Sequence, residues 1–328
     1  MCGIAGIFNV NGTPVPVPVL RAMTDIVRHR GPDGEGIWTH DGVGFGHRRL
    51  AIVDLSPSGH QPMRSTDGAL VITYNGELYN WRELRRELER KGATFRSQSD
   101  TEVILEAYRA WGPKCVDRFN GMFAFALWDA RTSRLFLARD RYGIKPLYYR
   151  WDGHTLLFGS EIKSILQHPA VRVNVDPNAL SEYFTFQNVL SDRTLFDGIK
   201  LLPRATMLTL TAGEPASFST KRWWDYQFVD EQGVPEAEYL EELDRLFRQA
   251  VDRQVQADVE VGTYLSGGID SGAVTCLTAR AHRNVKSFTA GFDLSSASGL
   301  ELAFDERAKA EQLSAAYKTE HYQVVLKA

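Results

Sequence analysis

The sequence predicts two folded parts of different class, an α+β part followed by an α/β part. Up to about residue 200, short apolar segments that favour strands predominate, with a few helix-like segments among them. From residue 259 onward, strand-like segments alternate with segments of helical periodicity, which is typical of a parallel sheet. The length of 328 residues also favours two domains. We therefore predict a first domain at 1–210, a linker at 211–235 and a second domain at 236–328.

The first part begins with an apolar segment directly after Cys2. Its large residues Ile4, Ile7 and Phe8 are separated by small ones, which predicts a buried strand. Further along, charged and apolar residues recur at helical spacing in two segments, and two apolar segments flank a polar turn. The resulting predicted elements are helices at 81–91 and 101–111 and strands at 123–128 and 135–139.

Asn75 and Gly76 lie between strand-like segments at 71–74 and 78–79. An Asn-Gly pair in this setting is a strong signal for a two-residue hairpin turn. Taken alone, the pair therefore predicts a hairpin. A tight turn can also present a backbone N–H group to a ligand, so a binding role at the same two residues stays open.

The second part contains a loop of small residues, 266–271, between a strand-like segment and a helix-like one. The N–H groups at the start of a helix and its positive dipole end make such a loop a ready site for anions. The loop is not of the Walker type, because no Lys follows its glycines. The predicted elements around it are strands at 259–265, 285–292 and 320–326 and helices at 273–281 and 305–317.

Cys2 follows the initiator methionine directly, and this position predicts a specific chemistry. The small Cys side chain should permit removal of Met1, which would leave a thiol and a free α-amino group on one residue. A thiol titrates near ~8.5 and an α-amino group near ~7.7 to 8.0, so the amine can accept the thiol proton near neutral pH. The alternative is a Cys that merely begins a buried strand, because free cysteines are often buried.

Four motifs follow Cys2 in a characteristic order. With the terminal Cys they closely resemble the glutaminase domain of class II, N-terminal-nucleophile glutamine amidotransferases, specifically the asparagine synthetase branch. The resemblance covers nearly the whole chain and implies an α+β sandwich of four αββα layers for the first part. For the second part it implies an α/β fold of the ATP pyrophosphatase kind. The four motifs are RHRGPDG at 28–34, GHRRLAIVD at 46–54, YNGELYN at 74–80 and SDTE at 99–102.

The resemblance implies a glutamine site around Cys2 as nucleophile. Arg49 would bind the α-carboxylate of glutamine, because a planar guanidinium suits a carboxylate. Asp100, with Glu77 nearby, would bind the α-ammonium. Asn75 and Gly76 would form the oxyanion hole. The complete implied set is Cys2, Arg49, Leu50, Ile52, Val53, Asn75, Gly76, Glu77 and Asp100.

Other segments of the family pattern permit more than one interpretation. The segment 30–34 reads as a turn because it contains Gly and Pro, and a role in closing over bound glutamine is an equal alternative. The segments 140–149 and 159–163 also match the family, and we interpret them mainly as scaffold and surface between domains.

The loop 266–271 resembles the Ser-Gly-Gly-x-Asp-Ser loop of ATP pyrophosphatases, which adenylate a carboxylate or similar oxygen and release pyrophosphate. We expect Mg²⁺ to accompany ATP, because the phosphate charge needs a hard, oxygen-liganded cation. No protein metal site is assigned, since His29, His47 and His60 are not spaced as ligands. The implied ATP residues are Ser266, Gly267, Gly268, Ile269, Asp270 and Ser271 around the phosphates, with Leu265 and Ala290 flanking the adenine.

The resemblance implies glutamine-dependent asparagine synthesis, in which ammonia released at Cys2 reacts with an adenylated aspartate to give asparagine, AMP and pyrophosphate. Three alternatives stay open. The same half-reactions could serve another carboxylate, in cell-surface polysaccharide or secondary-metabolite assembly, or the chain could be a glutaminase-only fragment or a non-catalytic glutamine-sensing fragment. A sugar-phosphate amidotransferase is disfavoured because 266–271 indicates ATP cleavage. The chain stops directly after its third predicted parallel strand, so we expect the second domain to be incomplete.

Composition agrees with a soluble intracellular enzyme of two domains. A net charge of −3 provides no basic surface for nucleic acid or anionic membrane, and no apolar run is long enough to span a bilayer. Three cysteines give no disulfide framework, and no signal peptide precedes Cys2, so we predict a cytoplasmic protein. The resemblance is compatible with a homodimer, which is common in the family.

Overall fold

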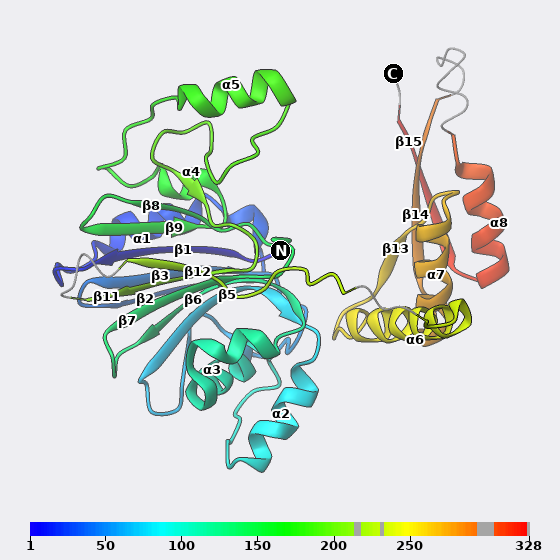
Figure 1. Cartoon of the computed structure of the whole chain (residues 1–328), viewed down its shortest axis with the longest axis horizontal. Coiled ribbons are helices and arrows are strands. Elements are labelled where there is room, and N and C mark those ends of the chain that lie inside the picture. The colour runs from blue at the N-terminus through cyan, green and yellow to red at the C-terminus, as the bar shows by residue number, and fades with distance from the viewer. Residues whose placement is uncertain (213–217, 230–232, 294–304, 327–328) are drawn as a thin grey trace. The chain divides into compact units, whose positions relative to one another are not determined.

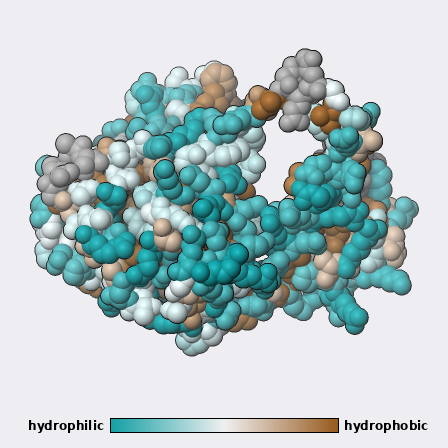
Figure 2. Space-filling model, turned by 60° about the horizontal axis from the view of Figure 1, so that its bottom comes forward, coloured by the Kyte–Doolittle hydropathy of each residue, from teal (hydrophilic) through white to brown (hydrophobic). Residues whose placement is uncertain are grey.

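The computed structural model describes residues 1–212, 218–229, 233–293 and 305–326. The chain divides into two compact units, Met1–Gln227 and Phe228–Ala328. Hydrophilic residues cover most of the face shown in Figure 2. Among the described residues, every helix is too short or too polar to cross a membrane.

In its described part, the first unit contains two six-stranded antiparallel sheets. The first sheet consists of β1 (Gly3–Asn9), β2 (Gly34–His40), β3 (Val43–Arg49), β8 (Tyr148–Trp151), β9 (Thr155–Gly159) and β10 (Lys200–Leu201), in the order β10-β8-β9-β1-β3-β2. The second consists of β4 (Met63–Arg64), β5 (Leu70–Leu78), β6 (Gly121–Asp129), β7 (Arg134–Arg139), β11 (Thr206–Thr211) and β12 (Ser219–Arg222), in the order β12-β11-β7-β6-β5-β4.

The two sheets pack face to face, with helices on both outer faces (Figure 1). Leu20 and Met23 of α1 pack on the outer side of the first sheet together with residues of α4. Trp81 of α2 and Ile104 of α3 pack on the outer side of the second sheet. This arrangement confirms the predicted αββα sandwich. The helices of this unit are α1 (Val17–Asp25), α2 (Trp81–Arg90), α3 (Asp100–Trp111), α4 (Ile162–Ile165) and α5 (Pro177–Phe186).

Strand β6 shows why the sequence forms such layers. Phe123, Phe125 and Leu127 point into the core beneath the helices, whereas Ala124 and Ala126 alternate with them and face the other sheet. A strand that is buried on both faces reads as a nearly continuous apolar run, and its period of two assigns small and large residues to different layers. The larger residues therefore fill the space beneath α2 and α3.

A polar pair also connects the two sheets. His47 of β3 lies within hydrogen-bonding distance of the Thr73 hydroxyl of β5, with 3.1 Å between ring Nδ1 and Oγ1. His47 is fully buried, and burial lowers its pKa to about 3. The ring is therefore neutral at physiological pH, as a histidine between two apolar sheets must be.

The predicted helices at 81–91 and 101–111 and the strands at 123–128 and 135–139 are confirmed within about two residues. The hairpin predicted at Asn75 and Gly76 is wrong. Strand β5 continues through both residues, and each pairs with β6, Asn75 with Ala124 and Gly76 with Phe123. A Cβ atom on Gly76 would lie 2.4 Å from the Met122 carbonyl oxygen, so the glycine serves close packing of the strands.

The second unit contains a three-stranded parallel sheet in the order β13-β14-β15, as the alternation of elements predicts. Strand β13 is shorter than the predicted 259–265, because its partner β14 begins opposite Gly262. Helix α7 starts four residues before the predicted 273, directly after Gly268 in the N-cap position. The elements are β13 (Gly262–Tyr264), β14 (Lys286–Phe292), β15 (Glu320–Leu326), α6 (Glu236–Gln254), α7 (Ile269–Ala281) and α8 (Arg307–Tyr317).

The range 211–235, predicted as a linker, contains the strand β12, which pairs with β11 of the first unit. Two parts of the range, 213–217 and 230–232, lie outside the described residues. The domain bounds of the sequence analysis stay predictions.

Gly6 of β1 provides a test of the packing. A Cβ atom there would lie 2.1 Å from the ring of Phe158, which is fully buried and has no room to move. We expect Gly6→Ala to lower the free energy of unfolding by about 1–3 kcal/mol. Urea unfolding followed by tryptophan fluorescence measures this, because all seven tryptophans lie in the first unit.

Gly34→Ala is the matched control, since a Cβ on this strand glycine would meet its nearest neighbour, Arg49, at an ordinary 3.6 Å. It should change the free energy of unfolding by no more than about 0.5 kcal/mol. Equal effects of the two substitutions would contradict the packing that we describe.

Candidate active site

One cavity in the first unit brings together the whole predicted glutamine set. Its volume is about 190 Å³. It lies where the start of β1, the end of β3, the end of β5 and the start of α3 converge. The predicted residues that line it are Cys2, Arg49, Leu50, Ile52, Val53, Asn75, Gly76, Glu77 and Asp100.

The Cys2 thiol lies against the backbone of Leu50. The Leu50 N–H group donates to Sγ at 3.3 Å, and Sγ lies 3.5 Å from the Leu50 carbonyl oxygen. Burial raises the pKa of the Cys2 thiol, and the hydrogen bond from Leu50 opposes this only in part. The thiol is therefore protonated at neutral pH and needs a base before it can attack.

The N-terminal ammonium group lies at the same cavity, which Met1 also lines. Burial lowers the pKa of this ammonium, and the positive charges of Arg30 and Lys145 lower it further, although Cys2 opposes them. An amine with a lowered pKa is neutral, and able to accept a proton, at lower pH than an exposed chain terminus.

Arg49 is held by the loop that follows β3. Its Nη1 donates to the Ser56 carbonyl oxygen at 3.2 Å, and its Nη2 donates to the carbonyl oxygens of Val53, at 3.4 Å, and Asp54. Gly59 makes room for the guanidinium, because a Cβ there would lie 2.1 Å from Nη2. The loop thus fixes a planar cation at the cavity wall, the geometry that suits a carboxylate ligand.

Asp100 and Glu77 give the cavity a negative side. Asp100 Oδ2 accepts hydrogen bonds from the Tyr74 hydroxyl at 2.8 Å and from the Leu78 N–H group at 2.9 Å. Burial raises the pKa of Asp100 despite these bonds. Burial also raises the pKa of Glu77, and the charge of Asp100 adds to the shift. Two acidic groups in a shielded site favour binding of a cation such as an ammonium group.

Asn75 is 1% exposed, yet neither polar atom of its side-chain amide has a hydrogen-bond partner among the described residues. Buried amides are nearly always paired, so an unpaired one needs an explanation. Asn75 lines the cavity. Its amide is therefore a donor and an acceptor available to a ligand.

Arg30 and Glu161 support the backbone of Cys2 from outside the cavity lining, and neither was predicted as a site residue. Arg30 Nε donates to the Cys2 carbonyl oxygen at 2.9 Å, and Arg30 Nη1 donates to Glu161 Oε1 at 3.0 Å. Glu161 also contacts His29 at 2.8 Å and Lys163 at 2.9 Å. Although burial favours the protonated acid, hydrogen bonds from Lys163, Arg30 and His29 lower the pKa of Glu161 to about 2.

This arrangement gives the segment 30–34 a structural role that the sequence analysis did not consider, since Arg30 fixes the backbone of Cys2, the predicted nucleophile. Glu161 lies in the segment 159–163, which we interpreted as scaffold, and 131 positions separate it from Arg30.

Lys145 lies within the segment 140–149, which we interpreted as scaffold, yet it lines the cavity and is 6% exposed. Burial lowers the pKa of its ammonium group, and Glu77 opposes the shift. Gln61 was also missed. Its side chain accepts a hydrogen bond from the Tyr74 N–H group at 2.7 Å and donates to the Thr101 hydroxyl at 3.3 Å, which ties β5 to α3.

In the second unit, the predicted ATP loop joins β13 to α7. The Ser271 hydroxyl accepts from the Ser266 N–H group at 3.1 Å, and the Ser266 hydroxyl accepts from the Gly268 N–H group at 3.1 Å. These bonds fix a tight turn at the helix N-terminus, on the edge where ligands of parallel sheets bind. Leu265 is buried and Ala290 is exposed.

Ile269, Asp270 and Ser271 form the first turn of α7. Within the described ranges, no three His, Cys, Asp or Glu residues form a group that could hold a metal ion.

Comparison with known proteins agrees with this geometry. Residues 1–224 match the glutamine amidotransferase domain family, and residues 242–328 match the asparagine synthase family. Glutamine phosphoribosylpyrophosphate amidotransferase from B. subtilis, solved with ADP and GMP, superimposes with a TM-score of 0.51 at 14% identity, over 99% of this chain and 90% of that one. This likeness concerns the fold alone.

The sandwich fold, the cavity around Cys2 and the match over 1–224 define the class, and the chain belongs to the glutamine amidotransferase family. Its curated relatives include two proteins of Bacillus subtilis (strain 168). Asparagine synthetase [glutamine-hydrolyzing] 3 is 42% identical over 285 residues, 85% of this chain and 45% of that protein. Asparagine synthetase [glutamine-hydrolyzing] 1 is 35% identical over 327 residues, 98% of this chain and 51% of that protein.

The resemblance to the asparagine synthetase branch is thereby confirmed. The chain spans about half the length of these curated relatives.

The ion cluster around Glu161 leads to a pH-dependent prediction. A carboxylate with a lowered pKa stabilises the folded state above its unfolded pKa of ~4.3, and the contribution is lost as the pH falls towards about 2. We expect Glu161→Gln to lower the free energy of unfolding at pH 7 by on the order of 1–2 kcal/mol. Tryptophan fluorescence in urea at pH 7, 5, 4 and 3 should show this difference shrinking below about pH 4.3.

The control is Glu87→Gln, which removes a carboxylate paired with Arg118 at 3.0 Å on the surface and away from the cavity. Its effect should be small at every pH, because surface ion pairs contribute little. A difference for Glu161→Gln that stays constant from pH 7 to 3 would contradict the ionised cluster.

Proposed function

We propose that the full-length protein is a glutamine-dependent asparagine synthetase. The observation that carries the proposal is the cavity in which the Cys2 thiol, the Arg49 guanidinium, the Asp100 carboxylate and the unpartnered amide of Asn75 meet. Glutamine offers a complementary set, an α-carboxylate, an α-ammonium and a side-chain amide. The similarity to asparagine synthetases extends into the second unit and supports the ATP-dependent half.

In the first half-reaction, the Cys2 sulfur attacks the side-chain carbonyl carbon of glutamine. The carbon–nitrogen bond of the amide breaks, the nitrogen takes up a proton and leaves as ammonia, and a γ-glutamyl thioester remains on Cys2. Water then attacks the thioester carbonyl, which releases glutamate and regenerates the thiol. Arg49 and Asp100 hold the two charged groups of glutamine so that its amide reaches the sulfur.

The base for Cys2 is its own α-amino group once Met1 has been removed. Burial raises the pKa of the Cys2 thiol, so the thiol is protonated at neutral pH and needs such a base. After methionine removal the amine is part of Cys2 itself.

The developing oxyanion would lie against Asn75 and Gly76. The side-chain N–H group of Asn75 has no partner among the described residues, so it can donate to this oxygen without breaking an existing bond. A donor that is already in place costs no reorganisation during the reaction.

In the second half-reaction, ATP would bind at the loop Ser266–Ser271, with Leu265 and Ala290 beside the adenine. An oxygen of the acceptor carboxylate attacks the α-phosphorus, pyrophosphate leaves, and ammonia then displaces AMP from the acyl-adenylate. Mg²⁺ would neutralise phosphate charge, because such charge needs a hard, oxygen-liganded cation.

Aspartate as acceptor, a reducing cytoplasmic location that keeps Cys2 a thiol, and a homodimer all stay part of the proposal. A different carboxylate acceptor is the alternative that the sequence analysis left open.

The glutaminase half makes a direct prediction. Cys2→Ser should reduce glutamate release from glutamine to background, because a hydroxyl is a far weaker nucleophile than a thiol under these conditions. Asn75→Ala should lower kcat by about 10²–10³-fold, the usual effect of losing one oxyanion donor. A coupled glutamate assay measures both variants.

Cys276→Ser is the matched control, since this partly buried cysteine lies in the second unit, and its glutamate release should equal that of the wild type. Sustained glutamate release by Cys2→Ser would contradict the assignment of the nucleophile.

The acceptor is tested by pyrophosphate release from the full-length protein given ATP, Mg²⁺ and glutamine, with and without aspartate. We expect release to require aspartate, because pyrophosphate leaves only when a carboxylate attacks ATP. Glutaminase activity without aspartate-dependent release would make another carboxylate the acceptor. Absence of both activities would contradict the proposed function.

A further inference from the structure

Two loops from distant parts of the sequence contribute to the cavity wall, 50–56 through Leu50, Ile52 and Val53 and 96–99 through Ser99. Residues 50–56 follow β3 and hold Arg49 through backbone carbonyl groups. Residues 96–99 lead into α3, whose first residue is Asp100. The α-carboxylate and α-ammonium of an amino acid are attached to the same carbon atom, so the two protein groups that bind them must keep a fixed separation.

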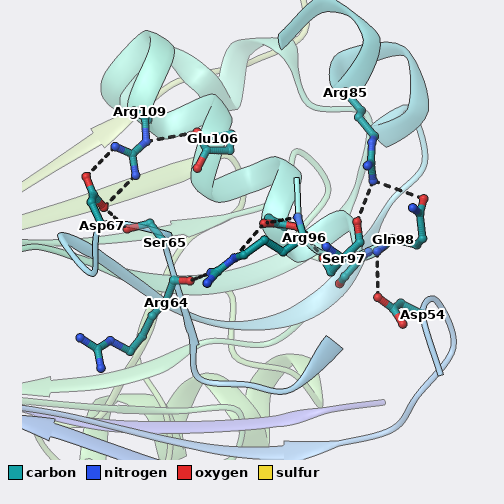
Figure 3. A network of polar contacts seen from close by, with 12 residues as sticks. Asp54, Arg64, Ser65, Asp67, Arg85, Arg96, Ser97, Gln98, Glu106 and Arg109 are labelled. Atoms are coloured by element: carbon teal, nitrogen blue, oxygen red, sulfur yellow. Dashed lines mark hydrogen bonds and ion pairs between the residues drawn. The ribbon is translucent and has the colours of Figure 1, made fainter. Parts of the chain in front are cut away.

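Asp54 connects these two loops. Its backbone carbonyl accepts a hydrogen bond from Arg49 Nη2, and its Oδ2 accepts from the Gln98 N–H group at 2.8 Å. Its Oδ1 accepts from the Ser56 N–H group at 3.1 Å and from the Ser56 hydroxyl. Figure 3 shows the Asp54 carboxylate directed at Gln98. The same residue thus contacts the Arg49 side chain and the loop before Asp100.

The backbone of Asp54 suits this double contact. Its φ angle of +56° lies in the left-handed region, which Asp adopts more readily than most residues. Asp54 is 7% exposed. Although burial opposes ionisation, hydrogen bonds from Ser56 and Gln98 hold the pKa of its carboxyl below the usual range, so the carboxylate is charged at neutral pH.

The loop 96–99 is fixed by hydrogen bonds to side chains of α2 and α3. Glu102 of α3 accepts hydrogen bonds from the N–H groups of Arg96 at 3.0 Å and Ser97 at 2.7 Å, and Arg85 of α2 donates to the Ser97 carbonyl oxygen at 2.8 Å (Figure 3). The loop 96–99 is fixed to α2 and α3. The hydrogen bond between Asp54 and Gln98 therefore sets the distance between this loop and the loop 50–56.

We propose that Asp54 is a positioning residue that sets the separation between Arg49 and Asp100 and thereby selects a free α-amino acid as the ligand of the cavity. This inference rests on the proposed glutaminase function. Asp54 acts through Arg49 and through the loop 96–99, and the structure gives it no place in the cavity lining. Its loss should therefore weaken glutamine binding and leave the chemistry at Cys2 nearly unchanged.

The test is Asp54→Asn in the full-length protein, a substitution that keeps the side-chain size and removes the charge. A hydrogen bond to a charged group contributes enough that its loss should raise KM for glutamine about tenfold, with kcat within about twofold of wild type. Discrimination between glutamine and 4-carbamoylbutyrate, which lacks the α-ammonium group, should fall by a similar factor. A general loss of stability would not produce this pattern.

Asp67→Asn is the matched control. Asp67 belongs to the same group of polar contacts in Figure 3, where Arg109 donates to it at 2.7 and 2.9 Å, but it contacts neither cavity loop. Its KM should equal that of wild type even if its melting temperature falls. If Asp54→Asn does not fold, Ser56→Ala decides the question, because it removes one donor to the Asp54 carboxylate and should raise KM by a smaller factor.

Alkylation of Cys2 by iodoacetamide, followed on the N-terminal peptide by mass spectrometry, reports occupancy of the cavity by glutamine through a readout other than glutamate release. We expect Asp54→Asn to be alkylated at the wild-type rate without glutamine and to need about tenfold more glutamine for protection. An unchanged KM in Asp54→Asn, or an equal rise in Asp67→Asn, would overturn the role of Asp54. A wild-type protein that neither releases glutamate nor is protected by glutamine would instead overturn the proposed function.

Discussion

The packing of the two antiparallel sheets against each other is the constraint on which the candidate site depends. Ile4 and Phe8 of β1 share one apolar core with residues of β6 and β7, so the position of β1 follows from contacts along its whole length. The cavity lies beside the ends of the strands that form this core. Cys2 precedes β1 directly, and the end of β5 supplies Asn75 and Gly76. A nucleophile at a chain terminus would ordinarily be mobile, and here it is placed by the strand that follows it and by Arg30.

The polar groups around the cavity fall into two sets, those that line it and those that support the lining residues. Arg49, Asp100 and Asn75 line the cavity, whereas Arg30, Gln61 and Asp54 hold the segments that carry them. Precise ligand placement requires such support. A side chain that is mobile before binding must become ordered, and the entropy lost in that step weakens ligand binding. Most of these supporting bonds run from a side chain to a backbone group, so they fix the path of the chain itself.

The sequence was sufficient for the parts of the site that lie in local motifs. Cys2 was predicted from its position in the chain, Arg49 and Asp100 from short motifs that resemble the family, and all three line the same cavity. Glu161 and Lys145 were missed, since their roles come from contacts across the fold that no spacing encodes. The hairpin at Asn75 was wrong for the opposite reason, because a strong local turn signal was overridden by pairing with β6.

The amide of Asn75, which has no hydrogen-bond partner among the described residues, has an energetic consequence for ligand binding. Burying a polar group without a partner costs ~1–3 kcal/mol, and a ligand that supplies the missing hydrogen bonds removes that cost. A substrate with a complementary amide would then act as a stabiliser of the native state, in proportion to its concentration over its dissociation constant. If glutamine is this ligand, as we propose, the first unit would resist heat and proteolysis best when glutamine is plentiful.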